Sequence, residues 1–311
     1  MGFLKWLFGP KKTLIAEDDD FCVYHSASLG LEAWSTCPSP FQGGAPAAIG
    51  LRSLLKQELL SDRMRPPKPD SFGHAIYASE RGDEVDVENV TTYNIGQWTS
   101  LGPKMRGLRI ERQTKILTLP PRPIRNEVHH YWRYFWDHSN SDFLCWRPKW
   151  RKAIKVKATG LPRSCLSDAR KVWYEAKRGI QACPSRWWGW QPIGNMSFAM
   201  RVHVEVPNPM WRGFSIKVKG VVDGIAAALH WQGQSDCAAA LADHLDVSPQ
   251  EICDLLQMSE GAVLGQHQAL LWSGSRLMVS PRDDLCVALE IGVDPTWESC
   301  PSIDFSVFGV S

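Results

Sequence analysis

Hydrophobic residues recur along the chain at strand and helix spacings. The clearest strand is predicted at 198–206, where Phe198, Met200, Val202, Val204 and Val206 share one face. Period-two patterns or short apolar runs also predict strands at 73–79, 107–118, 151–158, 214–218, 276–279 and 285–291. Helical spacing predicts helices at 49–61, 83–100, 164–178 and 221–231, and short helices within 237–266.

Two helix ends carry specific signals. The run Ser248-Pro249-Gln250-Glu251 is typical of a capping box with proline at the first helical position. Gly179 is a plausible stop for the helix at 164–178.

Strands and helices interleave, so we predict an α/β or α+β fold with a mixed β-sheet and helices packed on it. Each half of the chain has a strand (73–79; 198–206), then an acidic position opening a helix, then a further strand. Two similar halves are therefore one option, and a common pattern recurring by chance is the other. We divide the chain into an irregular segment 1–48, a basic, tryptophan-rich α/β region 49–195 and an acidic α/β domain 196–311.

Charge is distributed very unevenly along the 311 residues, although the net charge is only +2. Residues 101–200 contain 20 Lys/Arg against 6 Asp/Glu, and both flanking segments are acidic. This pattern favours a polyanionic partner. The nine cysteines include no CxxC pair, and no long apolar run is present. We therefore expect a cytoplasmic protein with reduced thiols and no membrane span.

The densest basic region lies beside Trp146 and Trp150, and cationic groups next to aromatic rings can bind phosphates and stack on bases. Its candidate nucleic-acid-binding residues are Arg147, Lys149, Arg151, Lys152, Lys155, Lys157, Arg163, Arg170 and Lys171. Lys155 and Lys157 are expected on one strand face. The alternatives are a solvated basic face, or pairing with the acidic C-terminal part of the same chain.

Three carboxylates form the candidate catalytic and metal site. Asp223 follows the predicted strand 214–218, and Asp283 and Asp284 precede the strand 285–291. If these strands are neighbours, the carboxylates meet at one end of the sheet, where oxygen ligands would suit Mg²⁺. Helix capping for Asp223 and a turn for Asp283 and Asp284 are the structural alternatives.

Residues 198–292 resemble RusA-type Holliday-junction resolvases. That family runs from a strand into an Asp-x-Asp-Asn turn and a helix, and later has Asp-Asp before another strand. This chain has the strand 202–206, then Lys219-Gly-Val-Val-Asp223-Gly, then Arg282-Asp283-Asp284 before LCVALEI. One Asp followed by Gly stands where the family has its paired acids. The resemblance implies magnesium-dependent cleavage of branched DNA by a dimer.

Three further patterns have structural and functional interpretations. An acidic set (Asp83, Glu84, Asp86, Glu88 and Asn89) is expected either at a helix start or as a cation site. Residues 238–256 match helix-turn-helix spacing, but 236–260 contain no Lys or Arg, which favours packed helices or protein docking. His129, His130 and His138 are expected in an aromatic core or as ligands.

The sequence thus predicts a nucleic-acid-associated protein, acting on DNA or RNA, with a Mg²⁺-dependent nuclease as one form. The first alternative is a non-catalytic nucleic-acid-binding protein. The second is a protein-interaction or assembly subunit that contacts other subunits or a second copy of itself.

Overall fold

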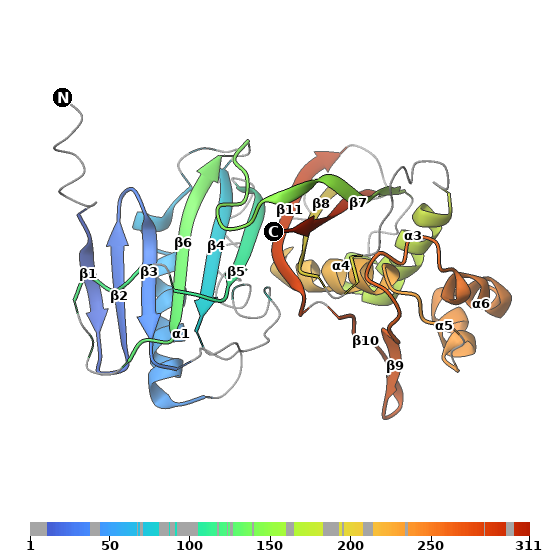
Figure 1. Ribbon diagram of the computed structural model, residues 1–311, viewed down its shortest axis with the longest axis horizontal. Coiled ribbons are helices and arrows are strands. Elements are labelled where there is room, and N and C mark those ends of the chain that lie inside the picture. The colour runs from blue at the N-terminus through green and yellow to red at the C-terminus, as the bar shows by residue number, and fades with distance from the viewer. Residues whose placement is uncertain are drawn as a thin grey trace. The chain divides into compact units, whose positions relative to one another are not determined.

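The computed structural model describes most of the chain. The described residues are 11–37, 44–66, 68, 71–80, 87, 91, 105–116, 118–122, 124, 127–138, 140–159, 165–182, 193–194, 196–207, 214–233, 236–282, 284–296 and 302–311. They form two compact units, Met1–Cys145 and Trp146–Ser311, and each contains parallel and antiparallel strands (Figure 1). Of the helices described, none combines the length and hydrophobicity needed to cross a membrane.

The first unit is a six-stranded mixed sheet with a helix on one face. Its elements are β1 (Thr13–Glu17), β2 (Phe21–Ser26), β3 (Gly30–Ser35), α1 (Pro46–Leu59), β4 (Ser71–Ser79), β5 (Met105–Gln113) and β6 (His130–His138). The strand order is β1-β2-β3-β6-β4-β5, and β4–β5 is the parallel pair.

Both faces of this first sheet are covered. α1 buries Leu51, Leu55 and Leu59. On the opposite face, Leu14, Ile116, Ile124 and Val128 pack against a core cluster that includes Trp34 and Tyr131. Every residue of β4 is buried as a result. A strand buried on both faces shows no clean alternation of polar and apolar residues, and the short apolar run at 73–79 predicted this one.

The second unit is a four-stranded mixed sheet with helices on one face. Its elements are β7 (Pro148–Ala158), α3 (Ala169–Gln181), β8 (Phe198–Pro207), α4 (Phe214–Ala228), α5 (Ala238–Leu245), α6 (Pro249–Gln257), β9 (Leu270–Ser273), β10 (Arg276–Val279), β11 (Cys286–Thr296) and β12 (Ser302–Val310). The order is β11-β8-β12-β7, with β11 parallel to β8 and the other pairs antiparallel; β9 and β10 form a separate hairpin.

The two units share one topology. In the first, β3, α1, β4, β5 and β6 follow in sequence, and their strands lie in the order β3-β6-β4-β5. In the second, β7, α3, β8, α4, β11 and β12 follow, and their strands lie in the equivalent order β7-β12-β8-β11 with the same parallel pair. The predicted mixed sheet with packed helices is confirmed, and its similar halves are visible as a repeated topology.

The predicted domain limits differ from these units. Residues 13–35 of the segment expected to be irregular form β1, β2 and β3, and the acidic run at 17–20 spans the end of β1 and the turn into β2. The units divide at Cys145/Trp146 rather than near 195. The reason is that basic β7 pairs with β12 at the far end of the chain, and composition does not reveal such a distant pairing.

Several individual elements also differ from prediction. Residues 214–218 begin α4 instead of forming a strand, because Val218, Val221, Val222 and Ile225 are all buried by one helix. Helix α3 continues through Gly179, where an added Cβ would lie 2.9 Å from Val156 Cγ1, so this glycine allows close packing on the sheet rather than ending the helix. Strand β12 was not predicted, although Ile303, Phe305 and Val307 alternate along it.

Candidate functional site

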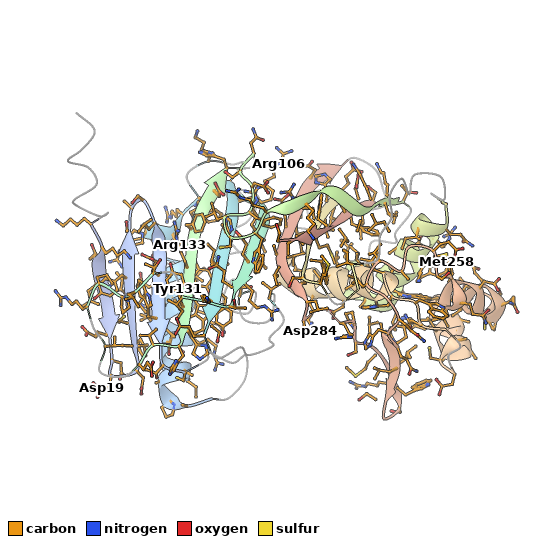
Figure 2. All side chains as sticks on the ribbon, in the orientation of Figure 1. Asp19, Arg106, Tyr131, Arg133, Met258 and Asp284 are labelled. Carbon is orange, nitrogen blue, oxygen red and sulfur yellow. The ribbon has the colours of Figure 1, made fainter. Side chains whose placement is uncertain are left out.

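The predicted acidic site is only partly described. Asp223 lies within α4, nearly buried, with one carboxylate oxygen 3.1 Å from Lys219 Nζ. Asp284 lies directly before β11 (Figure 2), whereas Asp283 is outside the described residues. Because 214–218 is helical, Asp223 does not follow a strand as expected, and the proposed meeting of two strand ends does not hold for it.

Metal binding by these residues stays a prediction. Within the part of the chain that the structure describes, no group of three or more His, Cys, Asp or Glu side chains is arranged to hold a metal ion. The acidic set Asp83, Glu84, Asp86, Glu88 and Asn89 lies outside that part.

Lys155 and Lys157 lie on one exposed face of β7, as predicted. The neighbouring strands place carboxylates beside them: Lys155 Nζ is 3.6 Å from Asp304 Oδ2, and Lys157 Nζ is 3.9 Å from Glu205 Oε2. Both carboxylates come from the acidic C-terminal part of the chain. The alternative of internal pairing therefore describes these two lysines.

The remaining basic candidates are described only in part. Arg170 on α3 pairs with Asp168, which also caps the helix, and Lys171 is on the same helix. Lys149 lies close to Gly309: a Cβ added to that glycine would be 3.6 Å from Lys149 Cδ. Arg163 is outside the described residues, as are the side chains of Arg151 and Lys152. The described cations thus divide between the sheet and the helix that covers its opposite face.

The rest of the open sheet face continues the ion pairing. Arg201 Nε is 3.7 Å from Glu290 Oε1, and His203 Nε2 is 3.0 Å from Asp294 Oδ2. These residues on β8 and β11 alternate with core residues such as Val202 and Val204. The face is therefore a lattice of opposite charges, and such half-exposed pairs each contribute little to stability.

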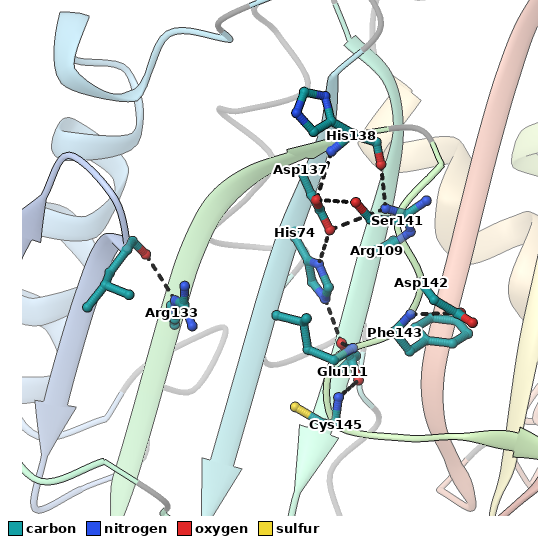
Figure 3. Close-up of polar contacts among 12 residues, drawn as sticks. His74, Arg109, Glu111, Arg133, Asp137, His138, Ser141, Asp142, Phe143 and Cys145 are labelled. Carbon is teal, nitrogen blue, oxygen red and sulfur yellow. Dashed lines mark hydrogen bonds and ion pairs between the residues drawn. The ribbon is translucent and has the colours of Figure 1, made fainter. Parts of the chain in front are cut away.

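A buried polar cluster that was not predicted lies in the first unit (Figure 3). His74 on β4 has Nε2 2.6 Å from Glu111 Oε1 and Nδ1 3.4 Å from Asp137 Oδ2. Arg109 Nη1 donates to the carbonyl oxygen of His138 at 2.9 Å and lies 3.4 Å from Asp137 Oδ2. Two carboxylates thus face one guanidinium and one imidazole.

This cluster fastens the chain segment that follows β6. The Glu111 carboxylate accepts backbone N–H groups of Leu144 and Cys145, each at 2.7 Å. Burial by itself would raise the pKa of Asp137, but hydrogen bonds from His74, Ser141 and the His138 backbone outweigh it and hold the pKa well below its usual range. Because its polar groups bond one another, we interpret the cluster as a structural anchor.

The sequence signal for this anchor was present but weak. Arg109 and Glu111 alternate with Leu108 and Ile110, which reads as a strand with one face in water. In the structure all four are buried. His130, one of the predicted aromatic-core histidines, is also buried, with Nδ1 3.0 Å from Tyr77 Oη.

A buried lysine joins the helices of the second unit. Lys177 on α3 is fully buried, and its Nζ donates to the carbonyl oxygens of His230 at 3.1 Å and Met258 at 3.4 Å. Burial lowers its pKa to about 8. It contacts the chain just after α4 and just after α6, so it fixes both helix ends.

Residues 229–285 lie between α4 and β11 and contain α5, α6 and the β9–β10 hairpin. The serine cap and the proline at the first helical position are confirmed: Ser248 accepts the Glu251 backbone N–H, and Pro249 begins α6, while the Glu251 carboxylate accepts the Tyr174 hydroxyl. α5 is attached to α3 through His244 Nε2, 2.6 Å from Asp168 Oδ2. The two helices are packed elements of the unit, which agrees with the packed-helix interpretation of the helix-turn-helix pattern.

The β9–β10 hairpin extends away from the sheet of its unit (Figure 1). From Leu271 to Arg282 no residue is buried. This stretch nevertheless contains Leu271, Leu277 and Val279, and Trp272 and Met278 are 41% and 47% exposed. Its base is ordered by polar contacts, since Gln232 Oε1 accepts the Leu270 N–H at 3.1 Å and the Ser280 N–H bonds the Ala269 carbonyl at 2.7 Å.

Comparison with known proteins adds no relative: no family model, no curated protein and no solved structure matches this chain. The function of this protein is therefore inferred from its own residues.

Proposed function

We propose that this protein is an interaction or assembly subunit and that residues 229–285 contact its partner. The observation that carries this proposal is the β9–β10 hairpin, in which Trp272 and Met278 are exposed and no residue from Leu271 to Arg282 is buried. Exposed apolar surface of this kind marks sites of protein contact.

The physical reason lies in the size of the hairpin. An isolated two-stranded hairpin is marginally stable in water, and the free edges of its strands leave backbone groups available for pairing. Trp272 and Met278 also belong to the residue types enriched in interfaces. A partner that covers them would stabilise the hairpin and remove their apolar surface from water.

The shared topology supports the same conclusion. The strands of both units follow the same order. The first unit has this order without a counterpart of α5, α6, β9 and β10 among its described residues. Residues 229–285 are thus not needed to build this sheet, which leaves partner contact as a reason for their presence.

The test uses the full-length protein after nuclease treatment. The variant Trp272→Ser/Met278→Ser removes exposed side chains and should fold normally, and Leu119→Ser, at a residue 78% exposed in the first unit, is the matched control. We expect the wild type and the control to form a complex, in self-association or partner capture, that the double variant loses. A monodisperse wild-type protein that captures no partner would contradict the proposal.

Nucleic-acid association is the second candidate, favoured by Arg147 and Lys149. Both are exposed, and neither pairs with a carboxylate among the described residues. A non-catalytic binder would show affinity that falls steeply with salt and ignores EDTA, and Arg147→Glu/Lys149→Glu would weaken it. A nuclease would cleave only with Mg²⁺ and lose activity on Asp223→Asn or Asp284→Asn. Unchanged cleavage by both variants would exclude the predicted acidic site.

A further inference from the structure

The hairpin and the α5–α6 pair carry opposite charges that form no ion pairs among the described residues. Arg276 on β10 and Arg282 after it are exposed, and neither guanidinium meets a carboxylate among the described residues. Asp243 on α5 and Asp254 on α6 are exposed and form no ion pair there. Between 236 and 260 the sequence contains no Lys or Arg, so this helical surface is acidic throughout.

Deepening the proposed function, on which this inference rests, we propose that the partner is a second copy of this chain. The hairpin of one copy would lie on the α5–α6 surface of the other, and the reverse contact would form at the same time. Such a two-fold arrangement uses the same patch on both copies, so the hairpin of each copy contacts the helices of the other. Arg276 and Met278, which lie on the same face of the hairpin, then face the aspartates of the helices.

Interface size favours this reciprocal contact. The strands of the hairpin have four residues each, whereas a standard interface uses about 20–30 residues a side. α5 and α6 add the residues of their exposed faces, so a copy that contributes both its hairpin and its helices comes nearer to that range. A partner that covered only the hairpin would bury much less.

The two surfaces are also held in place before any contact forms. α5 is fixed by the His244–Asp168 pair, and the chain after α6 is fixed by the Lys177 hydrogen bond to Met258. The base of the hairpin is fixed by Gln232. Preorganised surfaces lose less conformational entropy on association, which favours binding.

Sedimentation velocity on the full-length protein tests this inference at micromolar concentrations over a range of NaCl. We expect a dimer that weakens with salt. Arg276→Glu/Arg282→Glu should raise the dimer Kd by about tenfold or more, and so should Asp243→Lys/Asp254→Lys, since each reversal acts twice in a two-fold interface. Lys115→Glu, an exposed reversal in the first unit, should change nothing.

The decisive variant combines all four reversals. Opposite charges then face each other again, so the dimer should return, which a general loss of folding would not allow. A monomer at every concentration overturns the inference, and so does a dimer indifferent to these reversals. The proposed function survives a monomer only if the wild-type chain captures another protein through Trp272 and Met278, so the two failures are distinguishable.

Discussion

Lys177 offers the most direct test of the packing in the second unit. Its ammonium group is fully buried and bonded to two carbonyl oxygens, and its pKa falls to about 8 from an ordinary 10.5. At about 1.4 kcal/mol per pH unit, this difference corresponds to a cost of roughly 3 kcal/mol for keeping the charge buried. Lys177→Met removes that cost but leaves the carbonyls of His230 and Met258 without a donor, at about 1–3 kcal/mol.

The two effects nearly cancel at pH 7, so the wild type and Lys177→Met should have similar stability there. Below about pH 8 both the folded and the unfolded wild type keep the lysine proton. Between about pH 8 and 10.5 the unfolded chain still binds it while the folded protein does not, so the stability of the wild type rises with pH. From pH 7 to 10 the wild type should gain about 2–3 kcal/mol relative to the variant.

Urea unfolding followed by tryptophan fluorescence at pH 7, 8, 9 and 10 measures this difference. Lys171→Met on the same helix, at a half-buried lysine without an ion pair among the described residues, is the matched control and should show no such trend. A constant difference between the wild type and Lys177→Met across the pH range would refute the reasoning.

Three further predictions follow from local geometry. Gly224→Ala should destabilise the protein by about 1–3 kcal/mol, because the new Cβ would lie 2.6 Å from Ala169 O. Gly50→Ala, whose new Cβ would have its nearest atom at 3.8 Å, should instead stabilise the protein by about 0.5–1 kcal/mol, and equal shifts in Tm for the two variants would contradict this. Glu111→Gln should lower stability by about 3–5 kcal/mol and speed amide exchange at Leu144 and Cys145, and unchanged exchange would count against the anchor. Since the pKa of Asp137 is lowered on folding, the stability that its carboxylate contributes is present above about pH 3.9 and is lost as the pH falls below that value. Asp137→Asn should therefore make stability less dependent on pH in acid unfolding monitored by circular dichroism, and an unaltered acid profile would exclude this role.

Local signals predicted the elements that have one face in water or a defined cap. The strand at 198–206 became β8, the helix at 49–61 became α1, and Ser248 caps α6 as expected. Contacts between residues close in sequence determine these elements, so the local sequence is enough to predict them. The strand prediction at 214–218 was wrong because a short alternation of apolar and polar residues does not exclude a helix, and these residues begin α4.

Elements covered on both sides were harder to predict. β2 and β3 are buried at almost every position, which removes the period-two pattern that identifies a strand. The His74 cluster was missed for a related reason: its residues come from three strands and the following segment, and each polar residue considered alone resembles a surface position.

The sequence by itself determined the sign and position of every charge, the strong local periodicities and the helix caps, since these depend on residue type and short spacing. Only the tertiary structure decided which charges meet. β12 lies between β7 and β8, and this places Asp304 and Glu205 beside Lys155 and Lys157. Pairing of strands distant along the chain is set by burial of the shared core, so a basic segment became half of an ion-paired sheet.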